Sequence, residues 1–154
     1  MSPEVAAALR AELQGDEGIV LRCYDDATAK IVGPGTLVKG NVSIGCGRNL
    51  TSRGITSVEA DFLLNNDIAQ AEADLSPLPW ILAMTPKRQM VVYSLYFNTA
   101  LGSYRRFLAT WPHFLAQMEA EQYAEAAQNL RTSEPWATQV GARADRLADN
   151  VLYG

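Results

Sequence analysis

The chain of 154 residues has few of the side chains that bind metals or carry redox chemistry, with only two cysteines and one histidine. Cys23 and Cys46 belong to no CxxC or Cys/His motif, so we expect two free, buried thiols and no metal site. His113 has no serine or acid partner in a hydrolase-like motif, which leaves a Ser-His-Asp mechanism without support. The sequence therefore indicates neither a metal nor a cofactor.

Long apolar runs are also absent. No segment has the length of a signal peptide or a membrane span, so we expect no membrane insertion and a chain that stays where it is made. The formal net charge of −4 argues against a dedicated nucleic-acid binder, which would normally be basic. Lys87, Arg88, Arg105 and Arg106 have no acid between them, and form either an ordinary solvated face or a patch for an anionic polymer.

The patterns that are present begin with a helix and a small sheet. An apolar fraction of 48% is ample for the interior of one domain or of two small lobes. Ser2 and Pro3 open a helix with an N-cap hydroxyl and a proline at the first position, and Gly15 ends it. Short β-prone segments separated by glycine-containing turns predict a β-meander, at 19–24, 36–38 and 42–44.

A long helix is expected after the sheet. Thr56 and Glu59 have the spacing of a capping box, so this helix should cover about 57–75. Beyond Pro77 the pattern is helical throughout, and the helix that opens at Pro86 is apolar on most sides and therefore buried. Further helices are expected at 111–120, 122–131 and 141–152. The predicted fold class is α+β, with the sheet first and the helices after it.

Two carboxylates in the region of the predicted sheet are candidates for acid–base catalysis. Glu17 lies at the end of the first predicted helix, and Asp26 lies nine positions later, at the turn after a predicted strand. Cleavage of a glycosidic bond requires two carboxylates of this kind, one as the acid and one as the base or nucleophile. Most acidic residues are only solvated surface groups, so the spacing alone does not decide between the two interpretations.

The surrounding motifs add to this spacing. The chain contains, in order, Asp16-Glu17-Gly18, Tyr24-Asp25-Asp26 and Ser43-Ile44-Gly45-Cys46-Gly47. This succession resembles the active-site hairpin of the phage-type lysozymes, glycoside hydrolase family 24, which has Thr in a Thr-Ile-Gly-x-Gly strand. The resemblance continues in the same order through the segments 54–60, 93–98 with Phe107, 125–130 and 136–144.

The resemblance implies a lysozyme-like α+β fold, in which a small N-terminal β-lobe is joined by a long helix to an all-helical C-terminal lobe. A single domain would span 1–154. Its β-lobe would cover about 15–55, its linking helix 57–75, and its helical lobe 77–154 plus 2–14.

The resemblance also implies a muramidase, which hydrolyses the β-1,4 bond between N-acetylmuramic acid and N-acetylglucosamine with inversion. Glu17 matches the general acid, while Asp26 and Ser43 would position the attacking water. The saccharide-binding positions of the family fall on Asn49, Phe97, Thr110 and Asn129. The implied partner is peptidoglycan, with no nucleic acid. The enzyme would be a monomer that waits in the host cytoplasm until release, or is carried in a virion.

The chain departs from the family pattern at three places. Ser43 keeps a hydroxyl but lacks the methyl group that stiffens the side chain of threonine. Arg48 stands where compact relatives often have histidine, and is a candidate partner for Glu17. The segment between Asp26 and Ser43 is longer than in those relatives, which affects the shape of the cleft.

Two other classes of function remain open. A lytic transglycosylase uses the acid alone and releases an anhydro sugar, but such an enzyme needs no second carboxylate at Asp26. A wall-binding module without catalysis has no use for an acid at Glu17. The two carboxylates together therefore favour the hydrolase.

Overall fold

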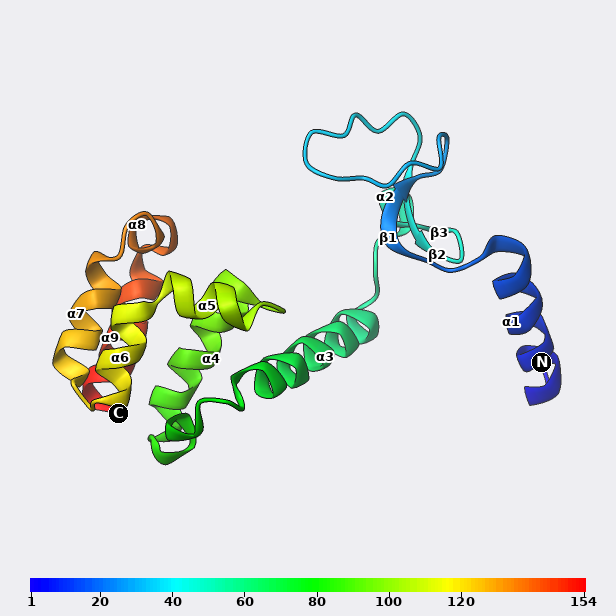
Figure 1. Ribbon diagram of the computed structural model, residues 1–154. Coiled ribbons are helices and arrows are strands. Elements are labelled where there is room, and N and C mark those ends of the chain that lie inside the picture. Colours follow the sequence, from blue (N-terminus) through cyan, green and yellow to red (C-terminus); the bar gives the residue numbers. More distant parts are fainter. The chain divides into compact units, whose positions relative to one another are not determined.

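The computed structural model describes all residues from Met1 to Gly154, and they form two compact units (Figure 1). The first unit is Met1–Ala60 and the second is Asp61–Gly154, and each is described by itself. The chain combines many helices with one small antiparallel sheet, so the α+β class is as predicted. None of the helices is both long and apolar enough to cross a bilayer.

The first unit contains the sheet and two complete helices. Its strands follow the order β1-β2-β3, and both neighbouring pairs are antiparallel. Its elements are α1 (Pro3–Glu17), β1 (Val20–Asp25), β2 (Val42–Gly45), β3 (Arg48–Asn49), α2 (Leu50–Arg53) and the first residues of α3 (Ser57–Leu75). The expected strand at 36–38 does not form. Thr36 bonds locally to Gly33, and the N–H groups of Lys39 and Gly40 donate to the side chain of Asp25.

Helix α1 starts as predicted and ends two residues later than Gly15. The Ser2 hydroxyl accepts from the N–H of Val5 at 3.4 Å, and Pro3 is the first helical residue. Gly15 is tolerated inside the helix, and Gly18 ends it with a φ of 65°, a conformation that favours glycine. Glu17 is therefore the last residue of the helix.

Strands β2 and β3 form a tight hairpin. Ile44 pairs with Arg48, and β2 ends at Gly45, which leaves only Cys46 and Gly47 between the two strands. Both glycines have positive φ, 65° and 73°. A side chain at either position would be strained, which explains the Gly-x-Gly pattern.

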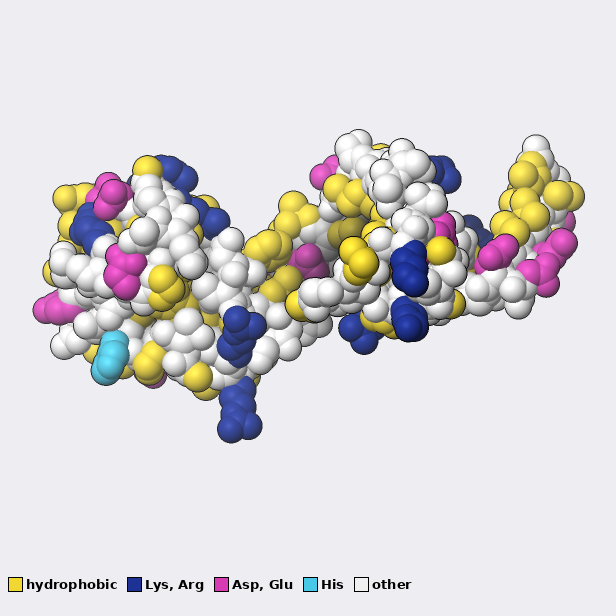
Figure 2. Space-filling model, turned by 90° about the horizontal axis from the view of Figure 1, so that it is seen from above, with side chains coloured by type: hydrophobic (Ala, Val, Ile, Leu, Met, Phe, Trp, Pro, Cys, Tyr) yellow, Lys and Arg dark blue, Asp and Glu magenta, His cyan; other side chains and the backbone are white.

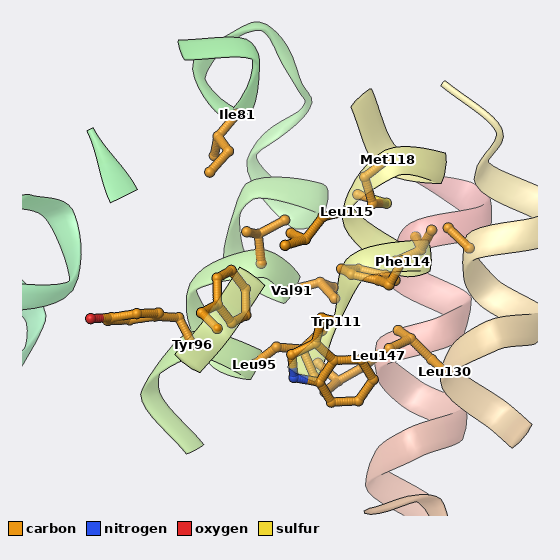
Figure 3. Packing of buried hydrophobic residues seen from close by; sticks show 14 of the residues in the cluster. Ile81, Val91, Leu95, Tyr96, Trp111, Phe114, Leu115, Met118, Leu130 and Leu147 are labelled. Carbon is orange, nitrogen blue, oxygen red and sulfur yellow. The ribbon is translucent and has the colours of Figure 1, made fainter. Parts of the chain in front are cut away.

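The second unit is entirely helical. Its elements are the remainder of α3, the 3₁₀-helix η1 (Pro79–Ala83), α4 (Pro86–Ala100), α5 (Tyr104–Thr110), α6 (Pro112–Glu119), α7 (Tyr123–Thr132), α8 (Trp136–Val140) and α9 (Ala142–Tyr153). Helix α4 is less buried than predicted: it buries one face, while Lys87 and Met90 are exposed. In Figure 3 the side chains of its buried face meet those of α6 in the core. Edge-to-face aromatic contacts join Tyr96 to Phe107 and Trp111 to Trp136, with 5.2 Å and 5.1 Å between the ring centroids.

The start of α3 confirms the predicted capping box. The N–H of Thr56 donates to the Glu59 carboxylate at 2.7 Å, and the N–H of Glu59 donates to the Thr56 hydroxyl at 3.3 Å. These reciprocal bonds satisfy two backbone groups that the helix itself leaves without partners.

Candidate functional site

Three of the predicted site residues lie on one face of the sheet. Ser43 pairs with Tyr24 on one side and with Asn49 on the other. Directly opposed residues project to the same face, so the side chains of Tyr24, Ser43 and Asn49 form a row across the sheet. Asp26 follows two residues after Tyr24, and its N–H donates to the carbonyl of Asn41 at 3.0 Å. The alternation of side chains therefore places Asp26 next to the row, diagonal to Ser43.

The Asp26 carboxylate is exposed and held by one neighbour. Its Oδ1 accepts from the backbone N–H of Asn41 at 2.7 Å, and its Oδ2 accepts from the Asn41 side-chain amide at 3.0 Å. Gly40 allows this close approach, since a Cβ at that position would lie 2.2 Å from Asp26 Oδ1. The carboxylate is thus oriented while remaining open to solvent.

Ser43 is only 2% exposed and lies at the centre of the row. No side chain or backbone group of the chain hydrogen-bonds to its hydroxyl. The hydroxyl therefore has no partner within the chain for its donor or its acceptor positions.

Glu17 faces the loop between β2 and β3. Its carboxylate is exposed, and its Oε2 lies 3.6 Å from the point that a Cβ on Gly47 would occupy. This is an ordinary contact distance, so the acid lies beside Gly47. The acid therefore adjoins the hairpin that carries Ser43 and Asn49.

The candidate pairing of Arg48 with Glu17 is wrong. The guanidinium instead binds Glu59, with Nη1 at 2.5 Å from Oε1 and Nη2 at 2.8 Å from Oε2. It also donates to the carbonyl of Gly54 at 3.0 and 2.9 Å. Because Arg48 directly follows Gly47 and precedes Asn49 on its strand, it projects to the face opposite the row and reaches the start of α3.

The hydrogen bonds that Glu59 accepts from Thr56 and Arg48 have a consequence for acid stability. Hydrogen bonds from Thr56, and then the bonds and charge of Arg48, lower the pKa of Glu59 from 4.5 to about 2. The folded pKa lies below the unfolded one, so the stabilisation is complete above pH 4.5 and disappears as the pH falls towards 2.

We expect Glu59→Gln to lower the thermal midpoint of unfolding at pH 6 and to have little effect near pH 2. Glutamine preserves the capping box, so the variant removes mainly the charge. The measurement is the difference in melting temperature between variant and wild type across this pH range. Glu12→Gln, at an exposed position of α1, controls for the change in net charge. A difference that does not vary with pH would contradict the assignment.

Asn49 has a structural role that the sequence did not indicate. Its Oδ1 accepts from the N–H of Ser52 at 2.9 Å and so caps α2. Its amide nitrogen makes no hydrogen bond within the chain and is available to a ligand.

The other three predicted binding residues belong to the second unit, at two separate hollows. Thr110 and Asn129 come together at a small cavity of about 100 Å³. Phe97 lines a different, apolar groove of about 360 Å³ between α3 and α4. His113 is exposed and also lines the small cavity. Figure 2 shows this single histidine, in cyan, at the surface.

Arg88 does not belong to a free basic patch. Its Nε donates to the carbonyl of Val151 at 2.8 Å, and its guanidinium lies 3.6 Å from the centre of the Tyr123 ring. The side chain therefore ties α4 to the C-terminal end of α9. Lys87, Arg105 and Arg106 are exposed.

Both cysteines are free, but only Cys23 is partly buried. The expectation of two buried thiols is wrong for Cys46, because it lies in the exposed turn between β2 and β3. No group of three or more potential metal-ligating side chains gathers in the chain.

In comparisons with known proteins, no family model matches the chain, and no curated protein matches it.

Proposed function

We propose that this protein is a lysozyme-like muramidase, which hydrolyses the β-1,4 bond between N-acetylmuramic acid and N-acetylglucosamine in peptidoglycan. One observation carries the proposal. Asp26, Ser43 and Asn49 share one face of the sheet, and the hairpin that bears the last two adjoins Glu17.

The proposed mechanism needs an acid on the leaving oxygen and a base behind the attacking water. Glu17 donates its proton to the glycosidic oxygen. Asp26, oriented by Asn41, takes a proton from the water while the Ser43 hydroxyl holds that water in place. Direct attack by water inverts the anomeric centre, and such enzymes keep their carboxyl groups about 6.5–9.5 Å apart.

Each unit, described by itself, offers groups that could contact a sugar. On the sheet, the free amide nitrogen of Asn49 can donate to a sugar oxygen. In the second unit, Phe97, Thr110 and Asn129 line surface hollows with apolar and hydrogen-bonding groups. The enzyme would act as a monomer and would reach the wall on release from the host cytoplasm, or from a virion.

The test is digestion of purified peptidoglycan in water labelled with heavy oxygen. The proposal predicts soluble fragments whose new reducing-end muramic acid carries one labelled oxygen. Unlabelled anhydro-muramic ends would instead identify a lytic transglycosylase. Binding to the wall with no release of sugar would identify a binding module, and either result would overturn the proposal.

A second expected result concerns Ser43. Ser43→Ala should slow wall clearing by about tenfold or more, since a hydrogen bond to a polarised partner contributes roughly 1.5–3 kcal/mol. Ser43→Thr retains the hydroxyl, and it should be neutral or mildly faster because the methyl group restricts the rotamer. The measurement is the initial rate of clearing at matched folded concentration. If Ser43→Ala clears the wall as fast as wild type, the hydroxyl has no role in catalysis.

A further inference from the structure

A second aspartate, Asp25, lies beside the candidate base and is buried. It is the last residue of β1 and only 1% exposed, whereas Asp26 next to it is exposed. Successive side chains of a strand point to opposite faces, so Asp25 does not belong to the row of site residues. The proposed mechanism leaves this carboxylate without a function.

The Asp25 carboxylate accepts four hydrogen bonds, two on each oxygen. Oδ1 accepts from the N–H groups of Ala27 at 3.0 Å and Gly40 at 2.9 Å. Oδ2 accepts from the N–H of Lys39 at 2.9 Å and the hydroxyl of Thr28 at 3.1 Å. The N–H of Lys39 contributes most to lowering the pKa of Asp25, against the opposing effect of burial, so the group is a carboxylate at neutral pH.

These four donors come from the two ends of one loop. Ala27 and Thr28 begin the segment 27–40, and Lys39 and Gly40 end it. The carboxylate therefore closes the long excursion between β1 and β2, which is seen in Figure 1 as the loop that leaves the sheet after β1.

The closed end of the loop directly determines how Asp26 is held. Gly40, which donates to Asp25, is followed by Asn41, which donates twice to Asp26. The position of Asn41 thus depends on Gly40, and Gly40 is held by Asp25. No other side chain hydrogen-bonds to the Asp26 carboxylate.

We propose that Asp25 is a positioning residue of the site: its buried carboxylate closes the 27–40 loop and so sets the orientation of the Asp26 carboxylate. The catalytic part of this inference rests on the proposed function. Asp25 touches no substrate, and it acts on the reaction through Gly40 and Asn41.

The test uses the full chain with Asp25→Asn and, as a milder change, Thr28→Val. An asparagine has one oxygen, so in either orientation its NH₂ group faces two of the four donors. Thr28→Val removes a single donor and preserves the shape of the side chain. Thr36→Val makes the same change in the same loop away from Asp25, and Asp16→Asn repeats the aspartate substitution at an exposed position.

Two readouts separate this inference from the proposed function. The first is hydrogen exchange of the Asn41 amide, which requires no substrate. It should accelerate by about tenfold or more in Asp25→Asn, and less in Thr28→Val. The second is kinetics on soluble wall fragments, where kcat should fall by about tenfold or more while KM changes little, because misplaced groups slow the chemical step.

Each of the following results would decide against one part of the inference. If exchange at Asn41 is unchanged in Thr28→Val and in folded Asp25→Asn, or if both controls accelerate it equally, Asp25 does not hold this segment and the inference fails. If Asp25→Asn raises KM and leaves kcat intact, Asp25 does not position the base. If wild type releases no sugar, the muramidase proposal fails, while the exchange measurement still decides whether Asp25 orients the segment that holds Asp26.

Discussion

Glu17→Gln is expected to reduce wall clearing to a few per cent of the wild-type rate or less. A general acid contributes roughly 10²–10⁴-fold to such reactions, and the amide cannot deliver a proton to the leaving oxygen. The side chain is exposed at the end of α1 and is nearly the same shape in both forms, so the fold should be preserved. The measurement is the initial clearing rate of purified walls at equal concentrations of folded protein.

The neighbouring acid offers a matched control for this variant. Asp16→Asn removes one negative charge from the same exposed helix end and should clear the wall at nearly the wild-type rate. Circular dichroism establishes that both variants are folded. Clearing above a few per cent in folded Glu17→Gln would rule out Glu17 as the general acid, and with it the proposed mechanism.

Asp26→Asn is expected to cause the second largest loss, severe but less complete than that of Glu17→Gln. The variant removes the base that takes the proton from water, while the Ser43 hydroxyl can still hold the water in place. The fold should be preserved, because the Asn41 side chain can turn its amide and remain hydrogen-bonded to the new amide. The measurement is the rate of fragment release.

Comparison with Asp25→Asn separates the roles of the two aspartates when the hydrogen exchange of the loop is measured as well as the activity. Loss of activity is expected in both variants, but only Asp25→Asn should loosen the 27–40 loop, since only Asp25 is bonded to both of its ends. If Asp26→Asn is as active as wild type, Asp26 is not the second carboxylate.

Features governed by near neighbours in the chain could be predicted from the sequence. The caps at Ser2 and Thr56 form where expected, because a capping side chain bonds to a backbone group within three residues. The α+β class followed from the change of hydrophobic pattern along the chain.

Side-chain partners far apart in the sequence were decided only by the tertiary structure. Arg48 was a candidate partner for Glu17, yet it binds Glu59 because strand alternation turns it to the other face of the hairpin. Arg88 was part of a presumed basic cluster, yet it bonds to Val151, 63 residues away.

The same distinction separates the two aspartates at the end of β1. Asp25 and Asp26 are adjacent and chemically identical, and the resemblance to the lysozyme family matches Asp26 to the second carboxylate. The functions of both depend on where the chain returns after the long loop, since Lys39 and Gly40 are 14 and 15 residues from Asp25. Local propensity does not specify that return. It is set by the register of β1 on β2 and by the four donors that gather around one buried carboxylate.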